Sequence, residues 1–152
     1  MSGVLAITPI VLDDASRLEV LEARAFGATS WGAGGVSGTL VMHGVGGLKA
    51  VREDVLVGFC LWRVAAEEGD ILTIAVDPAC RRQGIGRALL QALADRAAAA
   101  PISTLFLEVA ADNAAARRLY ETNGFVAIGS REGYYRSGDS AILMKRIFNC
   151  SN

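Results

Sequence analysis

The sequence lacks long apolar runs, paired cysteines and any excess of charge, and each absence narrows what the protein can be. No stretch approaches the roughly 20 uncharged apolar residues that a membrane-spanning helix requires. The N-terminus has no basic segment and reaches Asp13 and Asp14 before a long apolar run develops, which is unlike a signal peptide. We therefore expect a cytoplasmic protein that makes no membrane contact.

The cysteines argue against a disulfide-bonded or metal-binding protein, and the net charge argues against a nucleic-acid-binding protein. Cys60, Cys80 and Cys150 are widely separated, and His43 is the only histidine, so the spacing favours free thiols over disulfides or a bound metal. The formal net charge is −1, from 15 basic and 16 acidic side chains. Proteins that bind nucleic-acid phosphates carry a basic excess, so we expect no direct nucleic-acid binding and look only for a local anion site.

What the sequence does contain is enough apolar material for one domain over residues 1–152, since 52% of the residues are hydrophobic. Alternating periodicities indicate an α/β protein with a mixed sheet. A turn is expected at Glu67 to Asp70. The expected strands are 4–8 at a sheet edge, 48–54, 55–65, 71–76, 104–110, 125–129 and 140–147, and the expected helices follow Asp13 or Asp14, span 84–100, and run from Asp112 or Asn113 through Tyr120.

Two segments have a more specific meaning. Residues 71–76 are almost wholly apolar, as in a central strand, and with helix 84–100 and strand 104–110 they predict a right-handed parallel crossover. Eight glycines lie between Gly27 and Gly47. Because glycine raises the entropy cost of regular structure, we expect a mobile loop there with one short helix.

The run from Arg81 to Arg87, RRQGIGR, follows a strand and opens a helix. The first backbone N–H groups of a helix have no internal partner, and the helix dipole adds positive charge, so this start suits a pyrophosphate. Three arginines add charge-assisted contacts. The alternative is an ordinary glycine-rich helix start with solvated arginines. A GxGxxG dinucleotide motif and a GxxxxGK[ST] P-loop are both absent.

With this turn and the later segment NAAARRLYETNGF, the chain resembles the GNAT acetyltransferases, whose Q/R-x-x-G-x-G/A signature is matched by Arg81, Gly84 and Gly86. Residues 55–147 are most similar to the RimI type, which acetylates the N-terminal amine of a ribosomal protein. The glycine-rich N-terminal third departs from the pattern. The resemblance implies a mostly antiparallel central sheet with a splayed parallel strand pair and flanking helices, and acetyl-CoA as co-substrate.

The same resemblance assigns roles to individual residues. Glu108 matches the general base, which takes a proton from the acceptor amine directly or through water, and Tyr120 matches the general acid. From the residues alone, an ion pair with Arg117 or Arg118 is the favoured interpretation of Glu108, and a place in the core is the favoured interpretation of Tyr120. The matched cofactor-binding residues are Ile74, Ala75, Val76, Arg81, Arg82, Gln83, Gly84, Ile85, Gly86, Arg87 and Asn113.

The sequence offers several candidates for the residues that bind the acceptor and for the acceptor itself. Trp31, Tyr134 and Tyr135 are candidates to line a channel for a peptide N-terminus, with ordinary packing as the alternative. The expected acceptor is a protein N-terminus, that of a ribosomal protein. One alternative is the same chemistry on a small amine, which needs a closed pocket rather than a groove. Another is a non-catalytic acyl-CoA-binding sensor, against which the presence of both Glu108 and Tyr120 argues.

Overall fold

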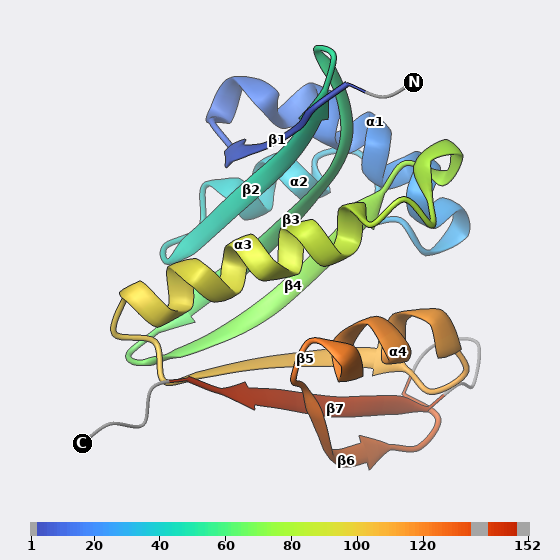
Figure 1. Ribbon diagram of the computed structural model, residues 1–152. Coiled ribbons are helices and arrows are strands. Elements are labelled where there is room, and N and C mark those ends of the chain that lie inside the picture. The colour runs from blue at the N-terminus through green and yellow to red at the C-terminus, as the bar shows by residue number, and fades with distance from the viewer. Residues whose placement is uncertain (1–2, 135–139, 149–152) are drawn as a thin grey trace.

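The computed structural model describes residues 3–134 and 140–148. One seven-stranded sheet runs through it in the order β1-β2-β3-β4-β5-β7-β6, and helices cover both faces (Figure 1). The strands are β1 Leu5–Pro9, β2 Val45–Arg52, β3 Val55–Ala65, β4 Glu68–Val76, β5 Thr104–Ala110, β6 Val126–Arg131 and β7 Ala141–Ile147, and the α-helices are α1 Ala15–Phe26, α2 Gly35–Leu40, α3 Ile85–Ala99 and α4 Ala114–Thr122.

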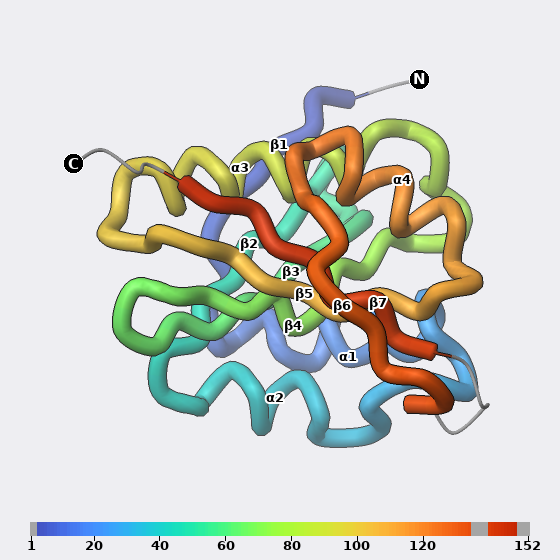
Figure 2. The backbone as a smooth tube through the Cα atoms, turned by 90° about the horizontal axis from the view of Figure 1, so that it is seen from below, coloured from blue at the N-terminus to red at the C-terminus, as the bar shows by residue number. Residues whose placement is uncertain are grey.

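Helices α1 and α2 lie on one face of the sheet, and α3 and α4 lie on the other (Figure 2). A separate apolar cluster fills each interface. Leu89, Leu93 and Leu107 belong to the cluster beneath α3, whereas Leu18 and Phe59 belong to the cluster beneath α1 and α2. The expected α/β fold with a mixed sheet is confirmed, and each predicted helix and strand is present.

Strands β4 and β5 are the parallel pair in this sheet, and they soon separate. They pair only from Glu68 to Asp70 on β4, opposite Thr104 to Phe106 on β5. Beyond these positions β4 continues along β3, and β5 continues along β7. The other strand pairs are antiparallel. The predicted parallel pairing of these strands is therefore confirmed, and the two strands form a wedge that opens toward their carboxyl ends.

Two predicted element boundaries need correction. Strand β2 begins at Val45 rather than at residue 48, and it includes Gly46 and Gly47. A Cβ atom at Gly46 would lie 2.8 Å from the Trp62 ring, so this glycine is required by close packing rather than by a loop. The turn predicted at Glu67 to Asp70 ends earlier, because β4 already begins at Glu68.

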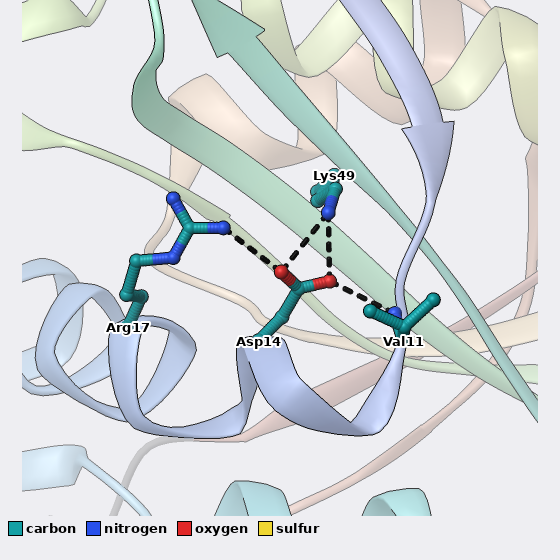
Figure 3. A network of polar contacts seen from close by, with 4 residues as sticks. All are labelled: Val11, Asp14, Arg17 and Lys49. Carbon is teal, nitrogen blue, oxygen red and sulfur yellow. Dashed lines mark hydrogen bonds and ion pairs between the residues drawn. The ribbon is translucent and has the colours of Figure 1, made fainter.

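Asp14 precedes α1 as predicted, but its carboxylate does not cap that helix. It accepts hydrogen bonds from Lys49 Nζ at 2.8 and 2.9 Å, from the Val11 amide at 2.8 Å and from Arg17 at 2.8 Å (Figure 3). Burial alone raises the pKa of Asp14, but the bonds from Lys49, Val11 and Arg17 outweigh it and lower the pKa to about 2. The carboxylate thereby ties α1 to β2.

Cys60 and Cys80 are free thiols, as predicted, and Cys150 lies outside the described residues. Burial raises the pKa of the Cys60 thiol to about 12. In the described ranges, no helix has the length and apolar character required to cross a bilayer.

Candidate active site

A cavity of about 710 Å³ lies where β4 and β5 separate. Its wall is formed by residues of β4, β5, β6 and β7 together with Trp31 and Tyr134. Two carboxylates, Asp70 and Glu108, and one guanidinium, Arg131, are the charged groups among its lining residues. An acceptor that carries a positively charged amine therefore meets more negative than positive charge in this cavity.

Glu108 lies in β5 between Leu107 and Val109, which point toward α3 and are buried. Because side chains alternate along a strand, Glu108 points to the other face, where it lines the cavity. Its side chain is 34% exposed, and a carboxylate oxygen lies 3.8 Å from the Arg131 guanidinium. The alternative ion pair with Arg117 is not observed, since Arg117 donates instead to the Ala111 carbonyl at 2.9 Å.

Tyr120 lies in α4 and packs against the α3-side cluster that contains Leu107 and Val109. Its ring meets that of Phe125 edge to face, with 6.0 Å between centroids. Tyr120 and Glu108 are therefore on opposite faces of β5, and Tyr120 is not among the described residues that line the cavity. Tyr120 is thus partly buried against the core, as in the alternative given for it above. The same position also suits a role at a reagent bound on the α3 side of the sheet.

Two of the three aromatic candidates meet in the cavity. Trp31 is 40% exposed and Tyr134 is 48% exposed, and both line the cavity with Glu108. The Arg131 guanidinium lies over the Tyr134 ring, 5.0 Å from its centroid. Tyr135 lies outside the described residues.

The start of α3 has the properties required of a phosphate site. Gly84 precedes the helix with φ 81°, and no side chain caps the helix start. A Cβ atom at Gly84 would meet no other atom within 4 Å, so the surface at this residue is open. The first-turn amides of Ile85, Gly86 and Arg87 have no partner within the helix, as at any helix start, and such amides can bind an anion. Arg82 and Arg87 are exposed at this helix start. These groups suit the pyrophosphate of a coenzyme A thioester.

The other residues of this turn have partners within the protein. Arg81 donates to the Ala25 carbonyl at 3.0 Å, and the Gln83 side chain accepts from Arg52 at 2.6 Å. A Cβ atom at Gly86 would lie 3.2 Å from Leu119, so this glycine permits contact between α3 and α4. The expected contact between Gly86 and the cofactor stays a prediction.

The remaining cofactor candidates are backbone positions and a helix cap. Ile74, Ala75 and Val76 pair with β3 along one edge of β4, and β5 is not paired with their other edge. An extended pantetheine arm has the hydrogen-bonding pattern to occupy that edge. Asn113 accepts from the Ala116 amide at 3.1 Å and so caps α4. Within the described ranges, no three Cys, His, Asp or Glu side chains are grouped closely enough to hold a metal ion.

Sequence reasoning missed Asp70, Arg131 and Glu22 as residues of this region. Asp70 was assigned to a turn, but it ends the part of β4 that pairs with β5, and it lines the cavity. Arg131 reaches Glu108 across two strand pairings, which no local pattern reveals. Glu22 lies in α1 and is only 2% exposed, and such a charged residue on the buried face of a helix is a signal that the sequence alone does supply.

Comparison with known proteins identifies a family for this chain. The acetyltransferase (GNAT) family pattern matches residues 29–125. The [ribosomal protein bS18]-alanine N-acetyltransferase of Salmonella typhimurium is 40% identical over 100 residues, 64% of this chain and 68% of that enzyme. N-alpha-acetyltransferase RimI of Mycobacterium tuberculosis is 39% identical over 142 residues, 88% and 86% of the two chains. The crystal structure of the ribosomal-protein-S18-alanine N-acetyltransferase from Escherichia coli superposes with a TM-score of 0.91 at 31% identity, covering 98% and 97%.

Proposed function

This chain belongs to the acetyltransferase (GNAT) family, and from that premise we propose that it moves an acetyl group from acetyl-CoA to the N-terminal amine of a ribosomal protein. The relatives named for this reaction support the proposal, and the match to the mycobacterial protein extends over 88% of this chain. Such an acceptor implies a cytoplasmic site of action.

The cavity at the strand wedge is the observation that carries the proposal. It places the Glu108 carboxylate beside two partly exposed aromatic side chains, Trp31 and Tyr134, on the α1 and α2 side of the sheet. Aromatic walls provide rigid contact area for a peptide, and the adjacent carboxylates suit its terminal ammonium. The start of α3 offers the donor site on the other side of the wedge. Donor and acceptor would therefore enter from opposite faces and meet between β4 and β5.

An N-terminal amine has a pKa near 8, and only its neutral form attacks a thioester carbonyl. Glu108 would accept the proton that the amine gives up, directly or through water. Tyr120 would donate its hydroxyl proton to the sulfur that leaves. Acetyl-CoA supplies the activated acyl group, while the backbone of Ile74 to Val76 and the α3 start would hold it.

The test is an acetylation assay with purified protein and acetyl-CoA. A peptide with the alanine N-terminus of ribosomal protein bS18 is compared with the same peptide blocked at its α-amine and with a panel of small amines. We expect acetylation of the free peptide alone, with the new acetyl group located on the α-nitrogen by mass spectrometry. Turnover of a small amine with no turnover of the peptide would contradict the proposal, as would binding of coenzyme A without any turnover.

A further inference from the structure

Glu22 is a buried carboxylate that the acetyl-transfer chemistry does not use. It projects from α1 and is 2% exposed. One of its oxygens accepts from the Ser30 hydroxyl, and the other accepts from the Trp31 amide at 2.8 Å. Within the described part of the chain no cation lies within ion-pair distance of it. Burying a carboxyl group is costly unless hydrogen bonds compensate, and the two bonds to residues 30 and 31 supply that compensation.

The segment that Glu22 holds also has backbone hydrogen bonds of its own, from the Ser30 amide to the Gly27 carbonyl at 3.0 Å and from the Gly35 amide to the Gly32 carbonyl at 3.1 Å. Gly27, Gly32 and Gly34 all have positive φ angles, 53°, 83° and 81°, and a Cβ atom at any of them would meet nothing within 4 Å. Such glycines leave the unbound chain many conformations. The bond from Glu22 continues through Ser30, whose hydroxyl oxygen also accepts from the Gly32 amide at 3.0 Å. The Glu22 carboxylate thus fixes residues 30 to 32 of this turn, directly or through Ser30.

Trp31 links this turn to the active-site cavity. Its backbone amide is bonded to Glu22, and its side chain lines the cavity that also contains Glu108. The Trp31 side chain also packs directly on the backbone of Gly35, since a Cβ atom added at Gly35 would lie 2.5 Å from the Trp31 Cβ atom. The indole therefore has a buried anchor on one side and the start of α2 on the other.

We propose that Glu22 is a positioning residue for acceptor binding, because it fixes Trp31 as a wall of the peptide site. This inference rests on the proposed function. It assigns to the glycine-rich segment a defined contact with the first residues of the acceptor. The donor site lies at the start of α3 and is not part of this arrangement.

Glu22→Ala is expected to raise KM for the peptide about tenfold while KM for acetyl-CoA stays within about twofold. Trp31→Ala should give a similar rise, and the double variant should be no worse than Trp31→Ala alone, because both changes remove one contact. Glu22→Gln keeps an acceptor for the Trp31 amide and should restore most of the peptide affinity. Glu19→Ala is the matched control. Glu19 lies in the same helix and accepts from the Ser37 amide and hydroxyl at 3.2 and 3.1 Å, outside the cavity.

A second measurement does not depend on activity, and a further variant leaves Glu22 itself unchanged. In a Trp62→Phe background, Trp31 is the remaining tryptophan, and acrylamide should quench its fluorescence more strongly in Glu22→Ala than in Glu19→Ala. Gly35→Ala, which displaces Trp31 without touching the carboxylate, should raise KM for the peptide in the same way.

Equal rises in KM for peptide and acetyl-CoA, or additive effects of Glu22→Ala and Trp31→Ala, would overturn the inference and leave the proposed function intact. Unchanged quenching would overturn it as well. Failure of the wild-type protein to acetylate the peptide would instead overturn the proposed function, and with it the acceptor role given to Glu22.

Discussion

The Arg131 guanidinium lies 3.8 Å from a carboxylate oxygen of Glu108, and each side chain comes from a different strand, β6 and β5. The Arg131 side chain is 55% exposed, so the pair is worth less than about 1 kcal/mol of folding free energy. The ion pair matters instead for what can approach the Glu108 carboxylate. An acceptor ammonium that approaches Glu108 must replace a cation that is already there.

Arg131→Met is therefore expected to lower KM for the peptide acceptor by about two- to fivefold, because the acceptor amine no longer competes with the guanidinium. The midpoint of urea unfolding should hardly change. Arg118→Met is the control, since Arg118 is an exposed arginine of α4 that does not line the cavity. A rise in KM for the peptide in Arg131→Met would mean that Arg131 contacts the acceptor instead of competing with it.

Glu108→Gln is expected to lower kcat more than Tyr120→Phe, with both effects within about 10²- to 10⁴-fold. A thiol has a pKa near 8.5, so the leaving thiolate needs little help from an acid, whereas a protonated amine cannot attack at all. Single-turnover assays at saturating acetyl-CoA would measure both. Phenylalanine keeps the edge-to-face contact with Phe125, so Tyr120→Phe retains this part of the packing. Equal losses of kcat, or the opposite order, would refute this division of roles.

Arg24 connects α1 to the loop before α3 and so to the proposed donor site. It donates two hydrogen bonds to the buried Asp77 carboxylate, at 2.9 and 3.0 Å, next to the Arg81 bond to Ala25. Arg24→Met should lower the free energy of unfolding by about 1–3 kcal/mol, because it leaves a buried carboxylate without its cation. KM for acetyl-CoA should rise severalfold while KM for the peptide stays constant.

The control for Arg24→Met is Arg17→Met. Arg17 lies in the same helix and also pairs with a buried carboxylate, Asp14, but at the end of α1 that is remote from the donor site. Arg17→Met should lower the free energy of unfolding without changing KM for acetyl-CoA. Equal effects of the two variants on acetyl-CoA binding, measured by calorimetry, would show that the loop before α3 does not depend on Arg24.

Local signals were sufficient to predict most of the elements. Strand 104–110 was predicted with the observed limits, because an apolar run is bounded by a proline-containing turn and by polar residues. Asn113 was predicted as a possible helix cap and does accept from the Ala116 amide. These features depend on residues within a few positions of one another, and short-range hydrogen bonds and period-two alternation determine them.

The missed features depend on contacts between distant segments. The start of β2 was missed because Gly46 and Gly47 resemble loop residues until the Trp62 ring and the Ile10 side chain are placed against them. The pair of Glu108 and Arg131 exists only once β6 and β7 have been added beside β5. The sequence pointed to Trp31 and Tyr134 as aromatic candidates, yet only the fold brings them to one cavity.

The Asp14 carboxylate provides a prediction about the acid stability of the fold. Its pKa is lowered from the ordinary 3.8 to about 2, because hydrogen bonds from Lys49, Val11 and Arg17 outweigh the effect of burial. A carboxylate with a lower pKa in the folded state binds protons more readily when the chain is unfolded. The contribution of Asp14 to the free energy of unfolding is therefore fully present above about pH 4 and is lost as the pH falls through about 2. This contribution totals about 2 kcal/mol.

Asp14→Asn should accordingly lower stability at pH 6, where Lys49 and Arg17 lose their charged partner, and should flatten the fall in stability between pH 4 and pH 2. Urea unfolding at each pH, followed by circular dichroism, measures this. Asp13→Asn is the control, because the neighbouring Asp13 is exposed and forms no ion pair with a described residue. If both variants and the wild type lost stability in parallel from pH 4 to pH 2, the acid sensitivity would arise from carboxylates other than Asp14.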